Sequence, residues 1–213
     1  MTSKEILMYL QQNIHTVIMA SNDENGNPIT CAIDIMLYEN ERLYFLTARG
    51  KEFYNRLIRN QYISLTGLKG DTTLTSISIS LQGKVRNIGH KNLEKIFLKN
   101  SYMTQIYPSK ESRDILEVFE IYEAQGEYFD LSQKPIFRQA FEIGDINLKH
   151  TGYFINTNCV GCNKCYERCN KCYEICPQKC IDISKVPVMI QQSHCLHCGK
   201  CREVCLYNAI ERR

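Results

Sequence analysis

Residues 195–205 read Cys195-Leu-His-Cys198-Gly-Lys-Cys201-Arg-Glu-Val-Cys205. This is the spacing C-x2-C-x2-C-x3-C, in which three cysteines lie close enough together to wrap three corners of an iron–sulfur cube. The fourth cysteine follows after the chain has turned away, and in proteins with two clusters it binds the other cluster. The stretch therefore predicts a 4Fe-4S cluster and requires a second cysteine set elsewhere in the chain.

A second, irregular cysteine set lies upstream of the first. It consists of Cys159, Cys162, Cys165, Cys169, Cys172 and Cys176, the last followed by Pro177. Residues 162–168 read CNKCYER and residues 169–175 read CNKCYEI, so one short segment occurs twice in tandem. When one copy is removed, the remaining residues have regular cluster spacing. We therefore expect two 4Fe-4S clusters that exchange their fourth ligands.

The spacing also predicts which cysteines bind iron. Cys176 corresponds to Cys205 as a crossing ligand, and Cys172 is favoured over Cys165 as the third ligand, because Cys172 and Cys176 are spaced like Cys201 and Cys205. The predicted metal ligands are Cys159, Cys162, Cys165 or Cys172, Cys176, Cys195, Cys198, Cys201 and Cys205. An ungapped set, Cys159-Cys162-Cys165-Cys169, remains open as an alternative. Cys180 aligns with Ala209 and is expected to fill a small core position.

Disulfide bonds and zinc sites also use cysteines, but both fit this sequence less well. Disulfides are typical of small secreted domains, whereas no apolar run follows Met1-Thr2-Ser3-Lys4, and we therefore expect no signal peptide and a cytoplasmic protein. Zinc binds C-x2-C pairs, but its sites rarely repeat the triplet C-x2-C-x2-C. Iron–sulfur binding is therefore the favoured interpretation.

Residues 1–150 have a different composition, with a single cysteine, Cys31, that we expect to be a core thiol. No apolar run approaches the roughly 20 residues of a membrane span, and the net charge of +3 is too small to indicate a nucleic-acid partner. We find neither a Ser–His–Asp set nor a phosphate-binding loop of the Walker type. We therefore expect no membrane or nucleic-acid partner.

Alternating apolar and polar residues predict a mainly β domain here. We expect helices at residues 3–12, capped by Ser3, and at 50–60 and 91–100. Strands are expected at residues 16–21, 29–38, 42–47, 62–68 and 73–85, with two or three more between 118 and 141. Six or more strands with few helices predict a small closed barrel, followed by a small α+β domain that carries the cysteines.

Three segments resemble a known family. They are IMASNDENGNPIT (18–30), RLYFLTARGKEFYNRLIRN (42–60) and ISISLQGKVRNI (77–88). Together they are similar to the pyridoxamine-5'-phosphate-oxidase-like family of FMN-binding split barrels, over about residues 5–145, while residues 153–213 resemble two-cluster bacterial ferredoxins. The resemblance implies an FMN-binding split-barrel domain at 1–145 and a ferredoxin domain with two 4Fe-4S clusters at 153–213, a pairing that recurs in anaerobes.

The resemblance implies an FMN held at a homodimer interface. Its phosphate would lie at Thr47-Ala48-Arg49-Gly50-Lys51, which offers a hydroxyl, two cations and an open backbone. The flavin ring would lie against residues 30–34 and a row formed by Ser76, Ser78 and Ser80. The expected FMN-binding residues are Thr30, Thr47, Arg49, Gly50, Lys51 and Ser78. The alternatives are a solvated loop and a polar outer strand face, and a deazaflavin or a haem in place of FMN also stays open.

The sequence departs from true pyridoxamine-phosphate oxidases, because residues 153–213 replace their carboxy-terminal basic and aromatic segment and the chain has no tryptophan. Oxidation of pyridoxamine phosphate is therefore not expected. We expect an oxidoreductase that passes electrons between 4Fe-4S clusters and FMN, with an external one-electron donor or acceptor and a small substrate. The alternatives are an electron carrier without its own substrate and a redox or iron sensor.

Two further expectations concern assembly. Apolar strand residues such as Ile33, Ile35, Leu43 and Phe45 exceed what one small barrel should need to bury, which favours a homodimer. Residues 144–152 connect the two domains and reach at most about 30 Å when fully extended. We therefore expect the cluster domain to dock on a barrel.

Overall fold

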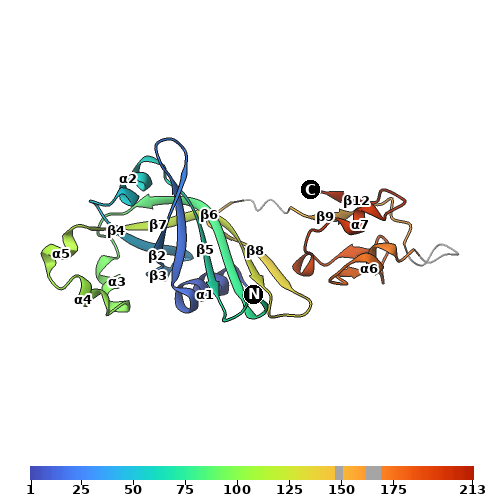
Figure 1. Ribbon diagram of the computed structural model, residues 1–213, viewed down its shortest axis with the longest axis horizontal. Coiled ribbons are helices and arrows are strands. Elements are labelled where there is room, and N and C mark those ends of the chain that lie inside the picture. The colour runs from blue at the N-terminus through green and yellow to red at the C-terminus, as the bar shows by residue number, and fades with distance from the viewer. Residues whose placement is uncertain (147–150, 162–168) are drawn as a thin grey trace. The chain divides into compact units, whose positions relative to one another are not determined.

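The computed structural model describes residues 1–146, 151–161 and 169–213. It divides into two compact units, drawn in Figure 1. The first unit contains Met1–Tyr128 and Ala140–Leu148, and the second contains Phe129–Gln139 and Lys149–Arg213. Within the described residues, no helix combines the length and the apolar character that crossing a membrane would require.

An eight-stranded sheet forms the first unit, in the order β2-β1-β5-β6-β7-β4-β3, with β8 paired to β7. The strands whose registers are defined pair antiparallel. Their bounds are β1 Thr16–Asn22, β2 Pro28–Asp34, β3 Leu37–Glu39, β4 Arg42–Ala48, β5 Tyr62–Lys69, β6 Ile77–Asn87, β7 Leu116–Asp130 and β8 Phe137–Ile143. The helical segments are α1 Ser3–Tyr9, η1 Leu10–Ile14, α2 Glu52–Arg59, η2 Thr73–Thr75, α3 Leu93–Lys99, α4 Met103–Ile106 and α5 Lys110–Asp114.

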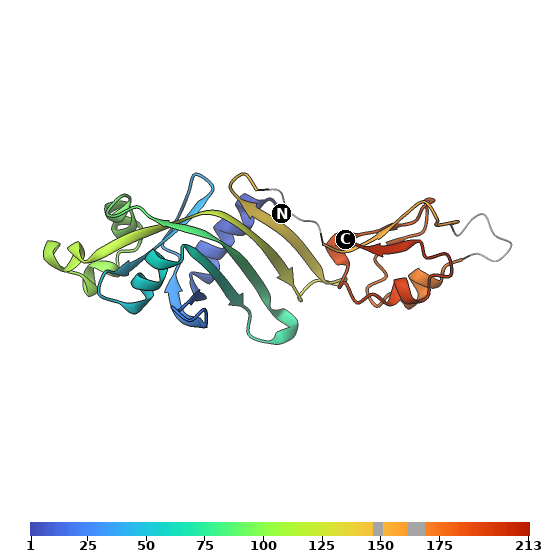
Figure 2. The ribbon, with the colours of Figure 1, turned by 90° about the horizontal axis from the view of Figure 1, so that it is seen from above.

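The sheet is curled, as Figure 2 shows from above, because the consecutive strands β2 and β3 lie at its opposite edges. Ile35 and Met36 connect β2 to β3 and so carry the chain from one edge of the sheet to the other. The Ile35 N–H donates to the His15 carbonyl beside β1 (2.8 Å), and the Met36 N–H donates to the Tyr44 carbonyl on β4 (2.8 Å). The side chains of Ile35 and Met36 are buried. This connection therefore spans the gap between the two edges, where strand pairing stops.

The inner face of the sheet carries the main core. Helix α2 covers it with Phe53, whose ring lies 6.1 Å from that of Phe45. The segment α1–η1 packs on β5 at Gly67, where a Cβ atom would come within 2.7 Å of Ile14 and 3.0 Å of Leu10. A glycine is therefore required for this close approach. The buried side chains of this core include Ile6, Leu7, Val17, Met19, Leu43, Leu57, Ile63, Leu65, Ile79, Leu81, Val85, Phe119, Ile121 and Phe141.

Strand β4 is buried on both faces, as its nearly continuous apolar sequence RLYFLTA indicates. Leu43 and Phe45 face the main core, whereas Tyr44 and Ala48 join a second cluster under α3 and α4. The members of that cluster are Met36, Leu37, Tyr44, Ala48, Leu93, Ile96, Phe97, Met103, Leu116 and Val118.

The opposite face of β2, β1, β5 and β6 is open. Strand registers place Ala32, Ile18, Thr66 and Ser80 in one row across the four strands, and Thr30, Ala20, Ser64 and Gln82 in the next. The side chain of Ile18 is 55% exposed, and that of Leu68 is 65% exposed. This outer face is therefore a surface of mixed polarity that no described helix covers.

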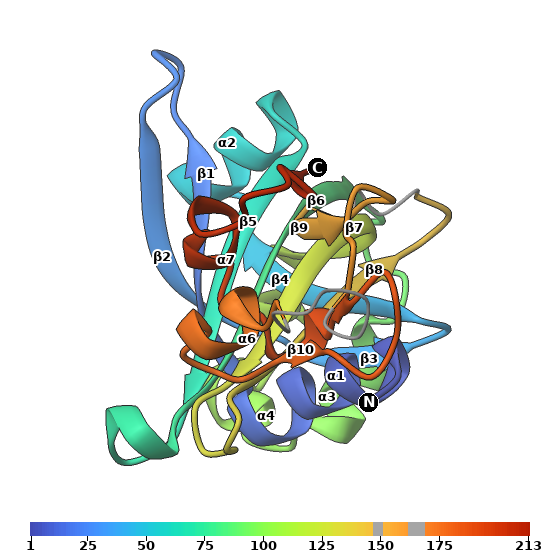
Figure 3. The ribbon, with the colours of Figure 1, turned by 90° about the vertical axis from the view of Figure 1, so that its right-hand side faces the viewer.

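The second unit contains short elements. They are β9 Tyr153–Ile155, α6 Lys171–Ile175, β10 Ile181–Asp182, β11 Met189–Ile190, η3 Gln192–His194, α7 Lys200–Glu203 and β12 Ile210–Arg212. β9 pairs with β12 and β10 pairs with β11, both antiparallel, and α6 and α7 lie side by side (Figure 3). Its core mixes aliphatic residues with cysteines: Cys176, Cys180, Ile181, Val188, Ile190, Cys195, Cys201 and Ile210.

The predicted fold class, a mainly β split barrel followed by a small α+β domain, is confirmed. The prediction that strand pairing closes the barrel completely is wrong, because β2 and β3 are free edges of the described sheet. The single strand predicted at 29–38 is broken at Ile35–Met36, where the chain changes edges. The first helix is capped by Thr2 rather than Ser3, through reciprocal bonds with Glu5.

One argument for a homodimer also fails. Ile35, Leu43 and Phe45 are fully buried within one chain, because both the inner core and the cluster under α3 and α4 use apolar strand residues. Their number is therefore no reason to expect a partner, and only the outer face described above bears on assembly.

Candidate functional site

Cysteines line a first small cavity of about 30 Å³ in the second unit. Cys159 follows β9, Cys169 and Cys172 lie at the start of α6, and Cys205 follows α7; all four line the cavity. Cys162 and Cys165, two predicted ligands, fall outside the described residues. The described part of the chain thus supplies four cysteines here, one of which, Cys169, belonged only to the ungapped alternative.

A second small cavity of about 20 Å³ has a similar lining. Cys195, Cys198 and Cys201 come from the regular motif, and Cys176 comes from the upstream set. Gly199, with a φ of +79°, turns the chain between Cys198 and Cys201, and a Cβ atom there would lie 2.7 Å from the Tyr153 hydroxyl. Residue 199 therefore needs glycine for both its backbone angle and its space.

The last cysteine of each motif lines the cavity that the other motif mainly forms. Cys205, which ends the regular motif, lines the first cavity, and Cys176, which ends the upstream set, lines the second. This is the arrangement that two interlocked clusters need. Among the residues that the structure describes, no three His, Cys, Asp or Glu side chains converge on one point as they would around a single ion. The cysteines instead line two separate small cavities.

Hydrogen bonds prepare several of these sulfurs for metal. The backbone N–H groups of His197 and Ala209 donate to the Sγ atoms of Cys195 and Cys205, each at 3.4 Å. The pKa of the Cys195 thiol is lowered mainly by a hydrogen bond from Cys180, with smaller contributions from the His197 N–H and the charge of Arg138. Because the thiolate is the metal-binding form, these contacts favour binding at Cys195.

Cys180 is buried in the second cavity, as the sequence predicted for a core position. Its Sγ lies 3.5 Å from that of Cys176. Hydrogen bonding to Cys195, burial and the nearness of Cys176 raise the pKa of the Cys180 thiol. Cys180 is thus held in its neutral form, which suits a packing role beside the other thiols.

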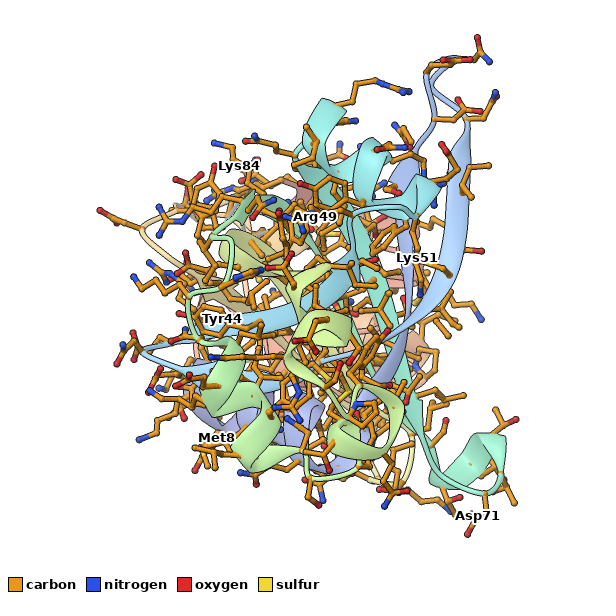
Figure 4. All side chains as sticks on the ribbon, turned by 90° about the vertical axis from the view of Figure 1, so that its left-hand side faces the viewer. Met8, Tyr44, Arg49, Lys51, Asp71 and Lys84 are labelled. Atoms are coloured by element: carbon orange, nitrogen blue, oxygen red, sulfur yellow. The ribbon has the colours of Figure 1, made fainter. Side chains whose placement is uncertain are left out.

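In the first unit, the predicted phosphate loop lies between β4 and α2, where Figure 4 labels Arg49 and Lys51. Arg49 is engaged by carboxylates of its own chain. Its guanidinium donates to Asp114 Oδ2 at 2.9 Å and to Glu117 Oε1 at 3.5 Å. Hydrogen bonds from Asn87 and Tyr54 also contribute to lowering the pKa of Glu117, so this carboxylate stays charged. A phosphate at Arg49 would therefore compete with two carboxylates.

Lys51 is exposed at the N-terminus of α2, and Gly50 beside it is also exposed. A second cation, Arg56, lies in the same helix and donates from Nε to Ser21 Oγ at 3.0 Å. The charges of Arg56 and Lys51 both act on Cys31, although burial is the stronger influence and raises the pKa of that thiol. Sequence reasoning missed Arg56, because nothing in the local pattern shows that a helix cation reaches β1.

The remaining predicted FMN-binding residues are separated. Thr30 is exposed on the outer face of β2, and Ser78 is half-buried on β6. Thr47 is buried on the inner face of β4, whereas residues 49–51 of the loop are exposed. Ser76 does not continue the serine row, because it lies in a turn and donates to the Thr73 carbonyl at 2.9 Å.

Comparison with known proteins gives two family matches. Residues 3–128 match the family model described as pyridoxamine 5'-phosphate oxidase, which covers more than half of the chain. Residues 167–209 match the model described as a 4Fe-4S dicluster domain. No curated protein matches the chain.

Solved structures resemble the chain in fold. A NimC/NimA family protein from Clostridium acetobutylicum is 17% identical with a TM-score of 0.54, and the match covers 66% of this chain and 92% of that one. A pyridoxamine 5'-phosphate oxidase-related, FMN-binding protein from Nostoc punctiforme is 14% identical with a TM-score of 0.48, over 68% and 96% of the two chains. The former likeness supports the split-barrel fold.

The two copies of the repeated segment provide a matched test of the first cavity. Two clusters correspond to about eight iron atoms per chain. We expect Cys169→Ser to reduce the iron content of anaerobically purified protein to about half, because Cys169 lines the cavity. Cys162→Ser, at the equivalent position of the other copy, is the matched comparison, and an equal loss of iron there would show that both copies supply ligands. Iron loss in Cys162→Ser with none in Cys169→Ser would restore the assignment made from spacing.

Proposed function

This chain belongs to the pyridoxamine 5'-phosphate oxidase family and carries a 4Fe-4S dicluster domain at its C-terminal end, and on that basis we propose that it passes electrons between two 4Fe-4S clusters and FMN. The observation that carries the proposal is the pair of cavities whose cysteines come from both motifs. An external one-electron donor or acceptor exchanges electrons with the clusters. A small substrate exchanges electrons with the flavin.

The residues present fit two clusters. Cys159, Cys169, Cys172 and Cys205 hold one, and Cys176, Cys195, Cys198 and Cys201 hold the other. Each set supplies the four thiolates that a cubane needs, and apolar side chains such as Ile155, Val188 and Ile190 complete the cavity walls. Apolar walls limit the access of water, which is one of the factors that set a cluster's potential.

The FMN phosphate fits the start of helix α2. The first N–H groups of a helix have no partner within it and attract anions. Lys51 adds a cation at this end and is exposed, and the charges of Arg56 and Lys51 both act on Cys31. We assign Lys51 the main phosphate contact, while Arg49 holds the loop in shape through Asp114 and Glu117.

FMN accepts two electrons and releases them singly or together, which allows it to connect one-electron clusters to a two-electron substrate. The protein's part is to hold the ring and keep it accessible. The open rows on β2, β1, β5 and β6 offer hydroxyls and small side chains for this purpose, including Thr30, Thr66 and Ser80. The Thr66 and Ser80 hydroxyls already hydrogen-bond one another at 3.0 Å, so their orientation is fixed.

The same outer face supports a homodimer. Ile18 and Leu68 expose large apolar side chains there, and a second copy would remove them from water. Burying such a side chain fully contributes about 1.5–3 kcal/mol. We propose that two copies meet over this face and cover the flavin between them.

The covalent chain favours electron transfer within one molecule. It passes between the units at both ends of residues 129–139 and again within residues 144–152. Covalent linkage keeps the effective concentration of each unit at the other high. Electrons should therefore reach FMN from the clusters of the same assembly, without a collision between assemblies.

The central test of the function is a stopped-flow measurement. Clusters are reduced anaerobically with a one-electron donor, and the loss of oxidised-FMN absorbance is followed. We expect a first-order rate that is independent of protein concentration. A rate proportional to concentration, or FMN that stays oxidised beside reduced clusters, would contradict internal electron transfer.

The phosphate assignment predicts that Lys51→Ala weakens FMN binding. At roughly 1.5–3 kcal/mol per charged hydrogen bond, the affinity of the apoprotein should fall at least about tenfold, measured by quenching of FMN fluorescence. Lys95→Ala is the control. Lys95 lies on α3, and its ammonium pairs with Glu39 on β3 at 2.6 Å, so it is already occupied by a carboxylate. Unchanged affinity in Lys51→Ala would place the phosphate elsewhere.

The dimer face predicts a monomer when a charge is placed on it. Leu68→Lys puts an ammonium into the proposed contact, where it would lose its water without a partner. Light scattering after size-exclusion chromatography should give the mass of one chain. Leu98→Lys on α3, where the leucine is 85% exposed, should leave the dimer intact. A wild-type monomer would refute this face as an interface.

A further inference from the structure

Residues 129–139 form the tip of the β7–β8 hairpin and belong to the second unit. The turn is fixed by Asp130, which is buried and accepts hydrogen bonds from the Ser132 N–H (2.9 Å) and the Gln133 amide (2.7 Å). A segment far upstream of the cysteine motifs, with a defined conformation, thus forms part of the cysteine-bearing unit.

Hydrogen bonds connect this tip to both loops of the second cavity. The Ile136 N–H donates to Gln178 Oε1 at 3.0 Å, two residues after Cys176. The Ile136 carbonyl lies 3.0 Å from Nδ1 of His194, which precedes Cys195. A carbonyl can only accept, so Nδ1 carries the proton. The tip therefore holds the loop after Cys176 and the turn before Cys195 at a fixed separation.

Arg138 reaches the cysteine itself. Its guanidinium donates to the Cys195 carbonyl at 3.1 Å, and the side chain is half-buried. This hydrogen bond holds a positive charge at the backbone of a cysteine that lines the second cavity. A cation held beside a cysteine ligand stabilises the extra electron of a reduced cluster attached to that cysteine.

We propose that Arg138 is a positioning residue that raises the reduction potential of the cluster held by Cys176, Cys195, Cys198 and Cys201. Net charge and hydrogen bonding near the sulfurs are among the determinants of cluster potential, and partial burial limits the screening of this charge by water. The hairpin tip thereby biases electrons toward the second-cavity cluster. The proposal rests on the clusters of the proposed function.

The test compares Arg138→Gln, which removes the charge but keeps a hydrogen-bond donor, with Arg138→Lys, which keeps the charge. Potentiometric titration of the full-length holoprotein is followed by electron paramagnetic resonance, after iron and sulfide assays. We expect Arg138→Gln to lower one midpoint potential and leave the other unchanged, and Arg138→Lys to stay near the wild type. Arg212→Gln on β12, an exposed site of the same unit, is the matched control and should shift neither potential.

The affected cluster is identified in a Cys205→Ser background, which should retain only the second-cavity cluster. The Arg138→Gln shift must persist there. An unchanged potential in Arg138→Gln, or equal shifts of both clusters, overturns the proposal. If Arg138→Gln loses iron, the Arg138→Lys variant decides the question. A midpoint potential near the wild type in Arg138→Lys supports the role of the positive charge. Loss of iron or a lowered midpoint potential in Arg138→Lys overturns the proposal. Wild-type protein without two clusters would instead refute the proposed function.

Discussion

The architecture of the first unit depends on one step of the backbone, from Ile35 to Met36. Their consecutive N–H groups bond to opposite sides of the sheet, one to His15 beside β1 and the other to Tyr44 on β4. Since backbone polar groups inside a protein need partners, this step can only be buried if both edges are brought together. The sheet must therefore curl, and the main core is enclosed by the resulting half-barrel.

This curl determines which surfaces are available for function. Strand β4 has apolar neighbours on both faces and offers no open side, whereas β2, β1, β5 and β6 keep one face free. The start of α2 is exposed at the end of β4 and carries Lys51. The proposed cofactor site therefore combines a rigid sheet face with a helix terminus, and both are supported by the buried core behind them.

Local patterns in the sequence predicted the features that depend on neighbouring residues, which are the strands and the cysteine spacing. Alternation predicted most of the strands, and cysteine spacing predicted that Cys176 and Cys205 each serve the other motif's cluster. The two cysteines line different cavities, and their binding of iron stays a prediction. Contacts between distant residues escaped prediction. No Gly or Pro marks the break at Ile35 in residues 29–38, and the pairing of Arg49 with Asp114 spans 65 residues. Neither has a periodic signal, because each arises only when separate elements pack together.

The position of residues 129–139 has a consequence for the evolution of this chain. A ferredoxin segment joined only through a linker can be exchanged for another by recombination at that linker. Here the contacts of Ile136 and Arg138 with Gln178, His194 and Cys195 cross such a cut point. A transplanted segment would have to match the hairpin tip as well, because an exchange at the linker alone would leave the tip without these partners.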